Sequence, residues 1–148
     1  MKIEIIAVGR LKKGTPFHAL LDNYTKQLKS DLKITEIDER RFQDKTQQNQ
    51  EIINKIPESS YLIVLDETGQ DTSSRSFADL IQKKCETGTN ICFIIGGADG
   101  LNNSVLEKAH KIISFGTFTW PHKMVRVMLV EQIYRAHQIK SGHPYHRD

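Results

Sequence analysis

The chain has little cysteine: only Cys85 and Cys92 occur in its 148 residues. Cys92 lies inside an apolar run, where a free thiol behaves as a small hydrophobe, so the pair indicates a reducing compartment rather than a disulfide framework. No apolar run reaches the roughly 18 residues that a membrane-spanning helix needs. The opening residues are charged and strand-like, unlike a signal peptide, so we expect a cytoplasmic protein with no membrane partner.

The chain also lacks a strong excess of either charge, because its 21 Lys and Arg and 18 Asp and Glu leave a formal net charge of +3. This mild excess permits an anionic partner but does not require one, since only clustered charge would indicate it. There is no repeat, linker or low-complexity segment. We therefore predict one domain over residues 1–148.

Apolar runs alternate with helical patterns along the chain. Strands are predicted at residues 3–8, 32–37, 61–65, 91–95 and 112–115. Of the predicted helices, the first begins at Pro16 and the second ends at Ile56. The third runs from Ser73 or Ser74 to about Cys85, the fourth from 102 to 110, and the fifth from Pro121 to about Ser141. Strands that alternate with helices predict an α/β fold with a parallel sheet.

Three of the predicted strands end in loops with ligand-like chemistry, at residues 65–69, 95–100 and 115–120. The carboxyl ends of parallel strands meet at one edge of the sheet, where such folds bind ligands, so we place the site there. Gly96 and Gly97 would let a ligand approach bare backbone, although three glycines in five residues could equally serve a tight turn.

The last predicted helix is unusual because residues 124–130 are apolar except for Arg126. A helix that is apolar nearly all round is usually buried, and a buried arginine needs a partner. The apolar surface exceeds what one face of a small sheet would cover, which predicts a two-fold homodimer. Beyond the helix, the tail places two histidines, a tyrosine and an arginine within the final six residues.

Other motifs favour plainer interpretations. Residues 9–15 have the glycine spacing of a phosphate loop but lack its lysine, so they are best explained as a basic turn. His143 and His146 lie in a terminal tail without nearby cysteine ligands, so we predict no metal site. Glu131 and Arg135 are spaced as an ordinary i,i+4 ion pair.

Three segments together carry a more specific signal: LDETG at 65–69, FIIGGADG at 93–100 and FTWPHKMVRVMLVEQIYRAHQIKSGHPYHRD at 118–148. They resemble the bacterial family of large-subunit (23S) ribosomal RNA pseudouridine N3-methyltransferases, which belongs to the SPOUT superfamily of knotted methyltransferases. The resemblance extends over the whole chain, with Gly116 where a serine is common in the family. It implies a parallel-sheet α/β SPOUT methyltransferase fold whose C-terminal segment forms a deep trefoil knot.

The resemblance also implies a cofactor, a substrate and an assembly. The cofactor is S-adenosylmethionine, and the substrate is a pseudouridine of the large-subunit RNA in the assembled ribosome. A homodimer is expected from the family as well. The cofactor-binding residues carried over are Leu65, Gly96, Phe115, Gly116, Thr117, Phe118, Thr119 and Trp120.

Methylation at N3 of pseudouridine needs in-line positioning and removal of a proton from the ring. The residues expected to perform this chemistry are Arg135, Tyr145, His146 and Arg147, and His122 and Arg126 offer further groups. We expect the tail to complete the partner's site, with a tail that packs only on its own subunit as the plainer alternative. The alternative functions are a non-enzymatic, ribosome-associated RNA-binding module and an α/β enzyme that binds another nucleotide.

Overall fold

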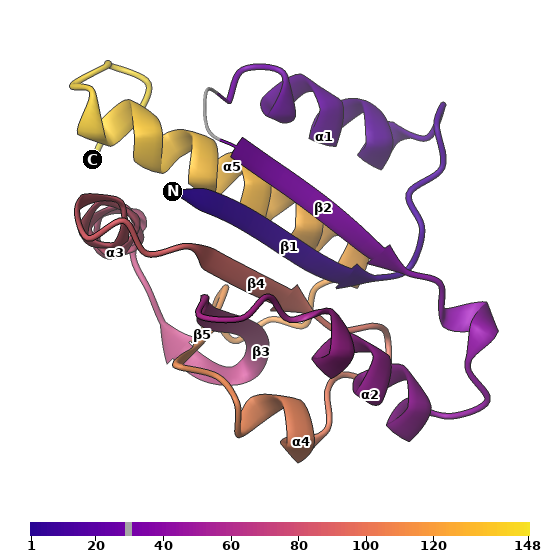
Figure 1. Cartoon of the computed structure of the whole chain (residues 1–148). Coiled ribbons are helices and arrows are strands. Elements are labelled where there is room, and N and C mark those ends of the chain that lie inside the picture. Colours follow the sequence, from indigo (N-terminus) through magenta and orange to yellow (C-terminus); the bar gives the residue numbers. More distant parts are fainter. Residues whose placement is uncertain (29–30) are drawn as a thin grey trace.

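Five parallel strands form a single sheet in the computed structural model, which describes residues 1–28 and 31–148 (Figure 1). The strands are β1 (Lys2–Val8), β2 (Asp31–Ile37), β3 (Tyr61–Asp71), β4 (Ile91–Ile95) and β5 (Lys111–Ser114). Their order across the sheet is β2-β1-β4-β3-β5, and every neighbouring pair is parallel. The predicted parallel α/β sheet is therefore confirmed.

Helices cover both faces of the sheet (Figure 1). They are α1 (Pro16–Thr25), α2 (Lys45–Lys55), α3 (Ser74–Glu86), α4 (Asn103–Leu106) and α5 (His122–Lys140), with a 3₁₀ turn η1 (Glu39–Arg41) before α2. One apolar core contains Leu21 from α1, Phe77 from α3 and Leu129 from α5. Ile52 and Val105 place α2 and α4 in the other core. Alternate residues of the central strands fill the two cores, which is why these strands are apolar throughout.

Local signals set most of the helix boundaries. The Ser73 hydroxyl accepts a hydrogen bond from the Ser76 N–H and so caps α3, as its sequence predicts. Helix α1 begins at Pro16, where a missing N–H has no cost. At the other end of the chain, α5 stops just before Gly142, which adopts a φ of +72° that favours glycine.

The structure corrects two predicted boundaries. Residues 66–71, predicted as loop, belong to β3, because after a bulge Gln70 and Asp71 pair again with β5. Gly69 permits this close approach, since a Cβ there would lie 2.6 Å from the backbone carbon of Ile113. Helix α4 ends at Leu106 and not at His110, whose backbone N–H donates to the Leu62 carbonyl 2.9 Å away. His110 therefore fastens the start of β5 to β3.

Among the described residues, no helix is both long enough and apolar enough to cross a membrane.

Candidate active site

A pocket of about 280 Å³ opens at the carboxyl ends of β4 and β5 and at the bulge of β3, which lies between them in the sheet. The three segments therefore meet as the sequence predicts, although the first belongs to a strand and not to a loop. The volume is close to the lower limit for small-molecule sites, roughly 300 Å³. Its walls come from residues 65–67, 95–101, 113–116 and 118–120, with His122 and Val125 from α5. Seven of the eight predicted cofactor residues line it, and Thr117, which is exposed, does not.

The glycine turn after β4 forms one wall. The Gly100 N–H donates to the Gly97 carbonyl at 3.0 Å, which closes the turn. A Cβ on Gly96 would lie 2.8 Å from Cγ of Leu101, and one on Gly97 would lie 2.9 Å from Cγ1 of Val8. Packing inside the protein therefore requires glycine at both positions, and the prediction that a ligand approaches bare backbone here stays a prediction.

The loop after β5 forms the opposite wall and is held by two internal hydrogen bonds. The Ser114 hydroxyl donates to the Gly116 carbonyl at 2.6 Å, and the Trp120 indole N–H donates to the Phe115 carbonyl at 3.0 Å. Gly116 has a φ of +94°, which a residue with a side chain rarely adopts. Phe118 remains 79% exposed beside Trp120, so the loop presents an aromatic face at the mouth of the pocket.

Two carboxylates, Asp66 and Glu67, lie on the pocket wall within β3, at its bulge. The Asp66 carboxylate accepts hydrogen bonds from the backbone N–H and the hydroxyl of Thr68. Glu67 is exposed beside it. Ionised carboxylates only accept hydrogen bonds, so this side of the pocket suits hydroxyl or ammonium groups of a ligand.

His122 begins α5 and supplies an imidazole to the pocket wall. Burial lowers the pKa of His122 below its ordinary value, with smaller contributions from Lys123 and Arg126 in the same direction and an opposing one from Glu39. Its Nε2 is buried, without a hydrogen-bond partner among the described residues. Burial therefore favours the neutral form of the ring over the charged form.

Arg126 lies one turn further along α5 and is fully buried. Its guanidinium donates to Glu36 Oε2 at 2.7 Å, to the Gly9 carbonyl at 2.7 Å and to the Val8 carbonyl at 3.3 Å. The predicted need for a partner is confirmed. These contacts occupy both terminal nitrogens, and only the buried Nε has no partner among the described residues, so Arg126 acts here as an anchor between α5 and the ends of β1 and β2.

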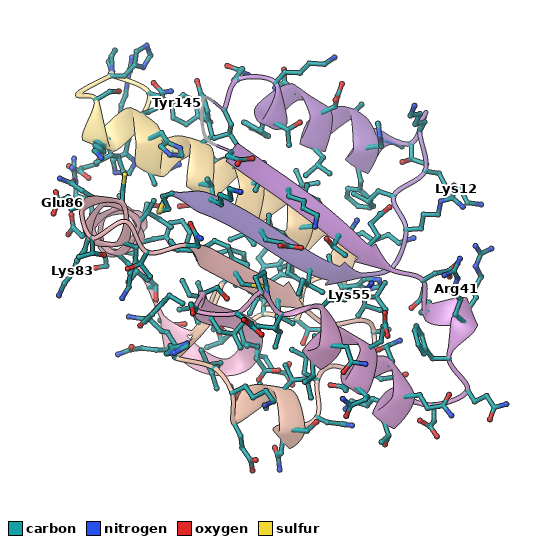
Figure 2. All side chains as sticks on the ribbon, in the orientation of Figure 1. Lys12, Arg41, Lys55, Lys83, Glu86 and Tyr145 are labelled. Carbon is teal, nitrogen blue, oxygen red and sulfur yellow. The ribbon has the colours of Figure 1, made fainter. Side chains whose placement is uncertain are left out.

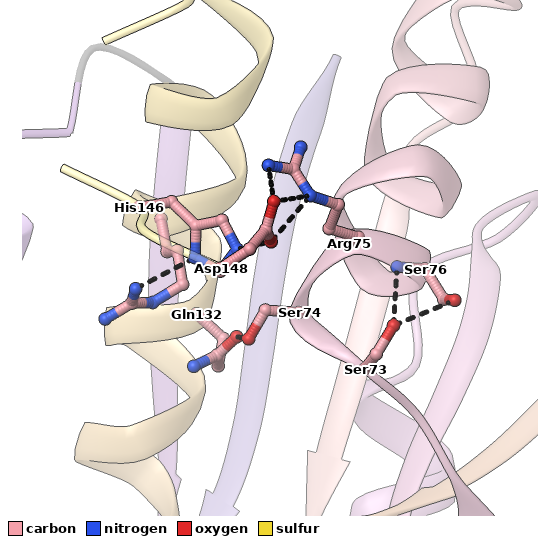
Figure 3. A network of polar contacts seen from close by, with 8 residues as sticks. Ser73, Ser74, Arg75, Ser76, Gln132, His146 and Asp148 are labelled. Carbon is pink, nitrogen blue, oxygen red and sulfur yellow. Dashed lines mark hydrogen bonds and ion pairs between the residues drawn. The ribbon is translucent and has the colours of Figure 1, made fainter. Parts of the chain in front are cut away.

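The residues predicted to perform the chemistry gather elsewhere. Tyr145 donates its hydroxyl proton to Glu131, whose carboxylate also binds Arg135. Arg135 contacts His146. His146 in turn contacts Asp148, which lies beside it in Figure 3. None of the four predicted residues lines the pocket, and Arg147 is exposed.

Asp148 ties the end of the tail to α3, because Arg75 binds its carboxylate through two nitrogens (Figure 3). Burial and the Glu131 carboxylate raise the pKa of Tyr145, so its hydroxyl stays protonated and donates. In the single chain the tail therefore packs on its own α3 and α5. The structure brings seven of the predicted cofactor residues together in the pocket, and Arg135, Tyr145 and His146 together beside the tail. Phe115 is the one predicted cofactor residue that also lies with Arg135 and Tyr145, in a second hollow.

A second hollow, of about 420 Å³, lies between α1, α5 and the tail. Its wall residues are Leu20, Tyr24, Phe115, Val127, Met128, Glu131, Gln132, Arg135 and Tyr145. Leu20 is 49% exposed there, although Val127, Leu129 and Val130 are buried by their own chain. Three apolar residues in this half of α5 are thus covered within the chain, and Met128 is half-buried on the wall of the hollow. Sequence reasoning missed it, because its residues come from two distant helices.

Among the described residues, no group of three or more His, Cys, Asp or Glu side chains is arranged to hold a metal ion.

A parallel sheet with a ligand-sized pocket at the carboxyl ends of adjacent strands defines an α/β enzyme-like fold. A family model described as "Predicted SPOUT methyltransferase" matches residues 1–146. The chain belongs to the SPOUT methyltransferase family. A solved structure, described as a probable methylase family protein from Haemophilus influenzae Rd KW20, shares this fold, with a TM-score of 0.58 at 12% identity over 99% of this chain and 70% of that chain.

Curated relatives match over nearly their full length. The proteins from Bradyrhizobium diazoefficiens and Paramagnetospirillum magneticum, both named "Ribosomal RNA large subunit methyltransferase H", are 44% and 39% identical, over 99% of this chain and 99% of each relative. The chain is therefore similar throughout to proteins named as ribosomal RNA methyltransferases.

Proposed function

We propose that the chain transfers a methyl group from S-adenosylmethionine to N3 of a pseudouridine in 23S ribosomal RNA, within the assembled ribosome in the cytoplasm. The observation that supports this most directly is the pocket, because its three walls are the segments on which the family resemblance rests. The names of the full-length relatives support RNA of the large subunit as the substrate.

The residues of the pocket suit the proposed cofactor. Leu65, Ile95 and Phe115 offer apolar surface for an adenine ring, and the carboxylates of Asp66 and Glu67 suit hydroxyl and ammonium groups. When bound, S-adenosylmethionine supplies a methyl group that its sulfonium has already activated, so no metal is needed. The trefoil knot that the resemblance implies remains part of this proposal.

The chain's own task is to position the base and take its N3 proton. Two imidazoles are candidates for the proton acceptor: His122 in the pocket wall and His146 in the tail. Arg147 is exposed and free to bind an RNA phosphate or the developing imide anion as a bidentate donor. These tail groups can act at the pocket only if something brings tail and pocket together.

We infer that a second copy of the chain does so. The hollow between α1 and α5 leaves Leu20 exposed and Met128 half-buried, and a two-fold partner would cover both while placing its own tail near this pocket. Light scattering at micromolar concentration should report about twice the chain's 17.0 kDa. A monomer at that concentration would contradict the arrangement.

The proposed activity is tested with labelled S-adenosylmethionine and ribosomes from cells that lack the enzyme. We expect label in 23S RNA at a pseudouridine N3 and none in ribosomes already modified. Cofactor binding without transfer to any RNA would contradict the proposal. Ribosome binding without cofactor binding would instead support the non-enzymatic RNA-binding alternative.

A further inference from the structure

Cationic side chains gather at the end of the sheet that holds the pocket. Arg10, Lys12 and Lys13 lie in the loop between β1 and α1, Arg40 and Arg41 lie in η1, and Lys123 lies in the first turn of α5. All are exposed except Lys123, which is half-buried. Figure 2 shows Lys12 and Arg41 extending outward at this end, with Lys83 at the opposite end of the molecule. We name these six residues the basic surface.

Most of this charge is not neutralised within the protein. Arg40 pairs with Asp38, but none of the other five forms an ion pair with a carboxylate in the described part of the chain. The nearby Glu36 carboxylate is already occupied by Arg126 and by the Leu11 N–H. The chain's small net charge of +3 is therefore distributed unevenly, with a local positive excess beside the pocket.

The basic surface is held in place by hydrogen bonds between its two loops. The Gly9 N–H donates to the Ile37 carbonyl at 2.8 Å, and the Leu11 N–H donates to Glu36 Oε2 at 2.7 Å. Buried Arg126 binds both Glu36 and the Gly9 carbonyl, which fastens the loops to α5. Fixed cations lose less freedom when they bind a ligand than cations on a mobile loop would.

The same contacts place the basic surface against the pocket. A Cβ on Gly9 would lie 2.9 Å from Nε2 of His122 and 3.5 Å from Cε of Lys123. A Cβ on Gly97 would lie 3.7 Å from the Glu39 carboxylate, next to Arg40 and Arg41. Because His122 and Gly97 both line the pocket, the loops that carry the basic surface pack against the pocket wall.

We propose that the basic surface binds the sugar–phosphate backbone of the RNA strand whose base enters the pocket. This rests on the proposed function and adds where the substrate lies. Phosphate contacts fix the position and orientation of a nucleic acid without reading its sequence. Lys12, Lys13 and Arg41 supply them here, while the shape of the ribosome supplies selectivity.

The test compares two triple variants that remove the same charge. The first is K12A/K13A/R41A on the basic surface. The second is K2A/K83A/K108A, whose exposed lysines lie near the amino ends of the strands and form no ion pairs with described residues. Binding to ribosomes that lack the modification is measured over a range of salt concentrations without cofactor, and S-adenosylmethionine affinity is measured by calorimetry.

For the first variant we expect at least tenfold weaker ribosome binding at about 0.1 M salt. The magnitude of the slope of log K against log salt should decrease by about 2, because each of the three lost phosphate contacts contributes roughly 0.7. Cofactor affinity should match that of the wild-type chain, and the second variant should retain the wild-type slope. Equal losses in both variants, or no loss in the first, would overturn the proposal.

A crosslinking experiment identifies what the surface touches. A photo-crosslinker attached through Lys12→Cys, in a Cys85→Ser background that removes the exposed native thiol, should label 23S RNA. Labelling of ribosomal protein alone would overturn the proposal. Failure of the proposed function is distinguishable, because ribosome binding is measured without cofactor. Charge-dependent ribosome binding without methyl transfer would support the basic surface as an RNA-binding site and contradict the proposed methyltransferase activity.

Discussion

The ion pair between Arg126 and Glu36 allows a quantitative test of how the fold holds a buried guanidinium. Glu36→Gln preserves the size of the side chain and one oxygen acceptor, so it removes little except the negative charge. Burial lowers the pKa of Arg126, and the hydrogen bond to Glu36 opposes that shift. Without Glu36 the cation would depend on the Val8 and Gly9 carbonyls.

The expected cost follows from exposure. Breaking a fully buried ion pair costs about 3–5 kcal/mol. The Arg126 side chain is 1% exposed, but the Glu36 side chain is 36% exposed, so water screens part of the lost interaction. Hydrogen bonds to charged groups contribute about 1.5–3 kcal/mol. We therefore expect Glu36→Gln to lower the free energy of unfolding by about 2 kcal/mol.

The measurement is urea denaturation at a fixed chain concentration, because self-association would change the apparent stability. Glu51→Gln is the matched control, since its i,i+4 pair with Lys55 is partly exposed on both sides and should be worth at most about 0.5 kcal/mol. In an Arg126→Met background, Glu36→Gln should lower the free energy of unfolding by less than about 0.5 kcal/mol, because no buried charge is then left without its partner. If Glu36→Gln costs no more than Glu51→Gln in the natural chain, the reasoning is refuted.

Three further outcomes are expected. Gly116→Ala should strain the pocket loop and so weaken S-adenosylmethionine binding at least tenfold in calorimetry. The control is Gly88→Ala, which introduces similar strain at a φ of +66° far from the pocket and should leave the affinity unchanged. Equal affinities of the two variants would contradict the assigned cofactor site. Tyr145→Phe should reduce stability by about 1 kcal/mol in urea, and no change would mean that its bond to Glu131 does not form in solution. Deleting residues 145–148 should preserve cofactor affinity but slow methyl transfer by about a hundredfold, and a fully active deletion would exclude the tail from the chemistry.

The sequence predicted the elements that depend on local chemistry. Capping by Ser73, the proline at the start of α1 and the glycine after α5 are signals that act within a few residues, and their helices begin and end close to the predicted positions. The strands were recognisable because continuous apolar runs suit strands covered on both faces. The edge at which the loops meet then followed from the parallel arrangement alone.

Features that depend on distant contacts could not be predicted. The partner of Arg126 is Glu36, 90 residues earlier in the chain, and no local pattern links them. Gly69 is required by β5, and Gly96 is required by the Leu101 side chain, so both are explained by tertiary packing. The roles of the site residues came from the family resemblance, since a pocket wall made of backbone and apolar side chains has no distinctive spacing.

Helix α5 explains why one chain separates its pocket from its tail. His122 and Arg126 are one turn apart and so share a face, which is directed toward the pocket and the ends of β1 and β2. Glu131 follows His122 by nine residues, and at 3.6 residues per turn this places it about 180° round the helix, some 13 Å along the axis. Because Glu131 holds Tyr145, the tail is docked on a different side of α5 from His122. Phe115 lines both the pocket and the hollow that contains Glu131 and Tyr145, so a partner chain seated in that hollow, as proposed above, would stand beside the pocket.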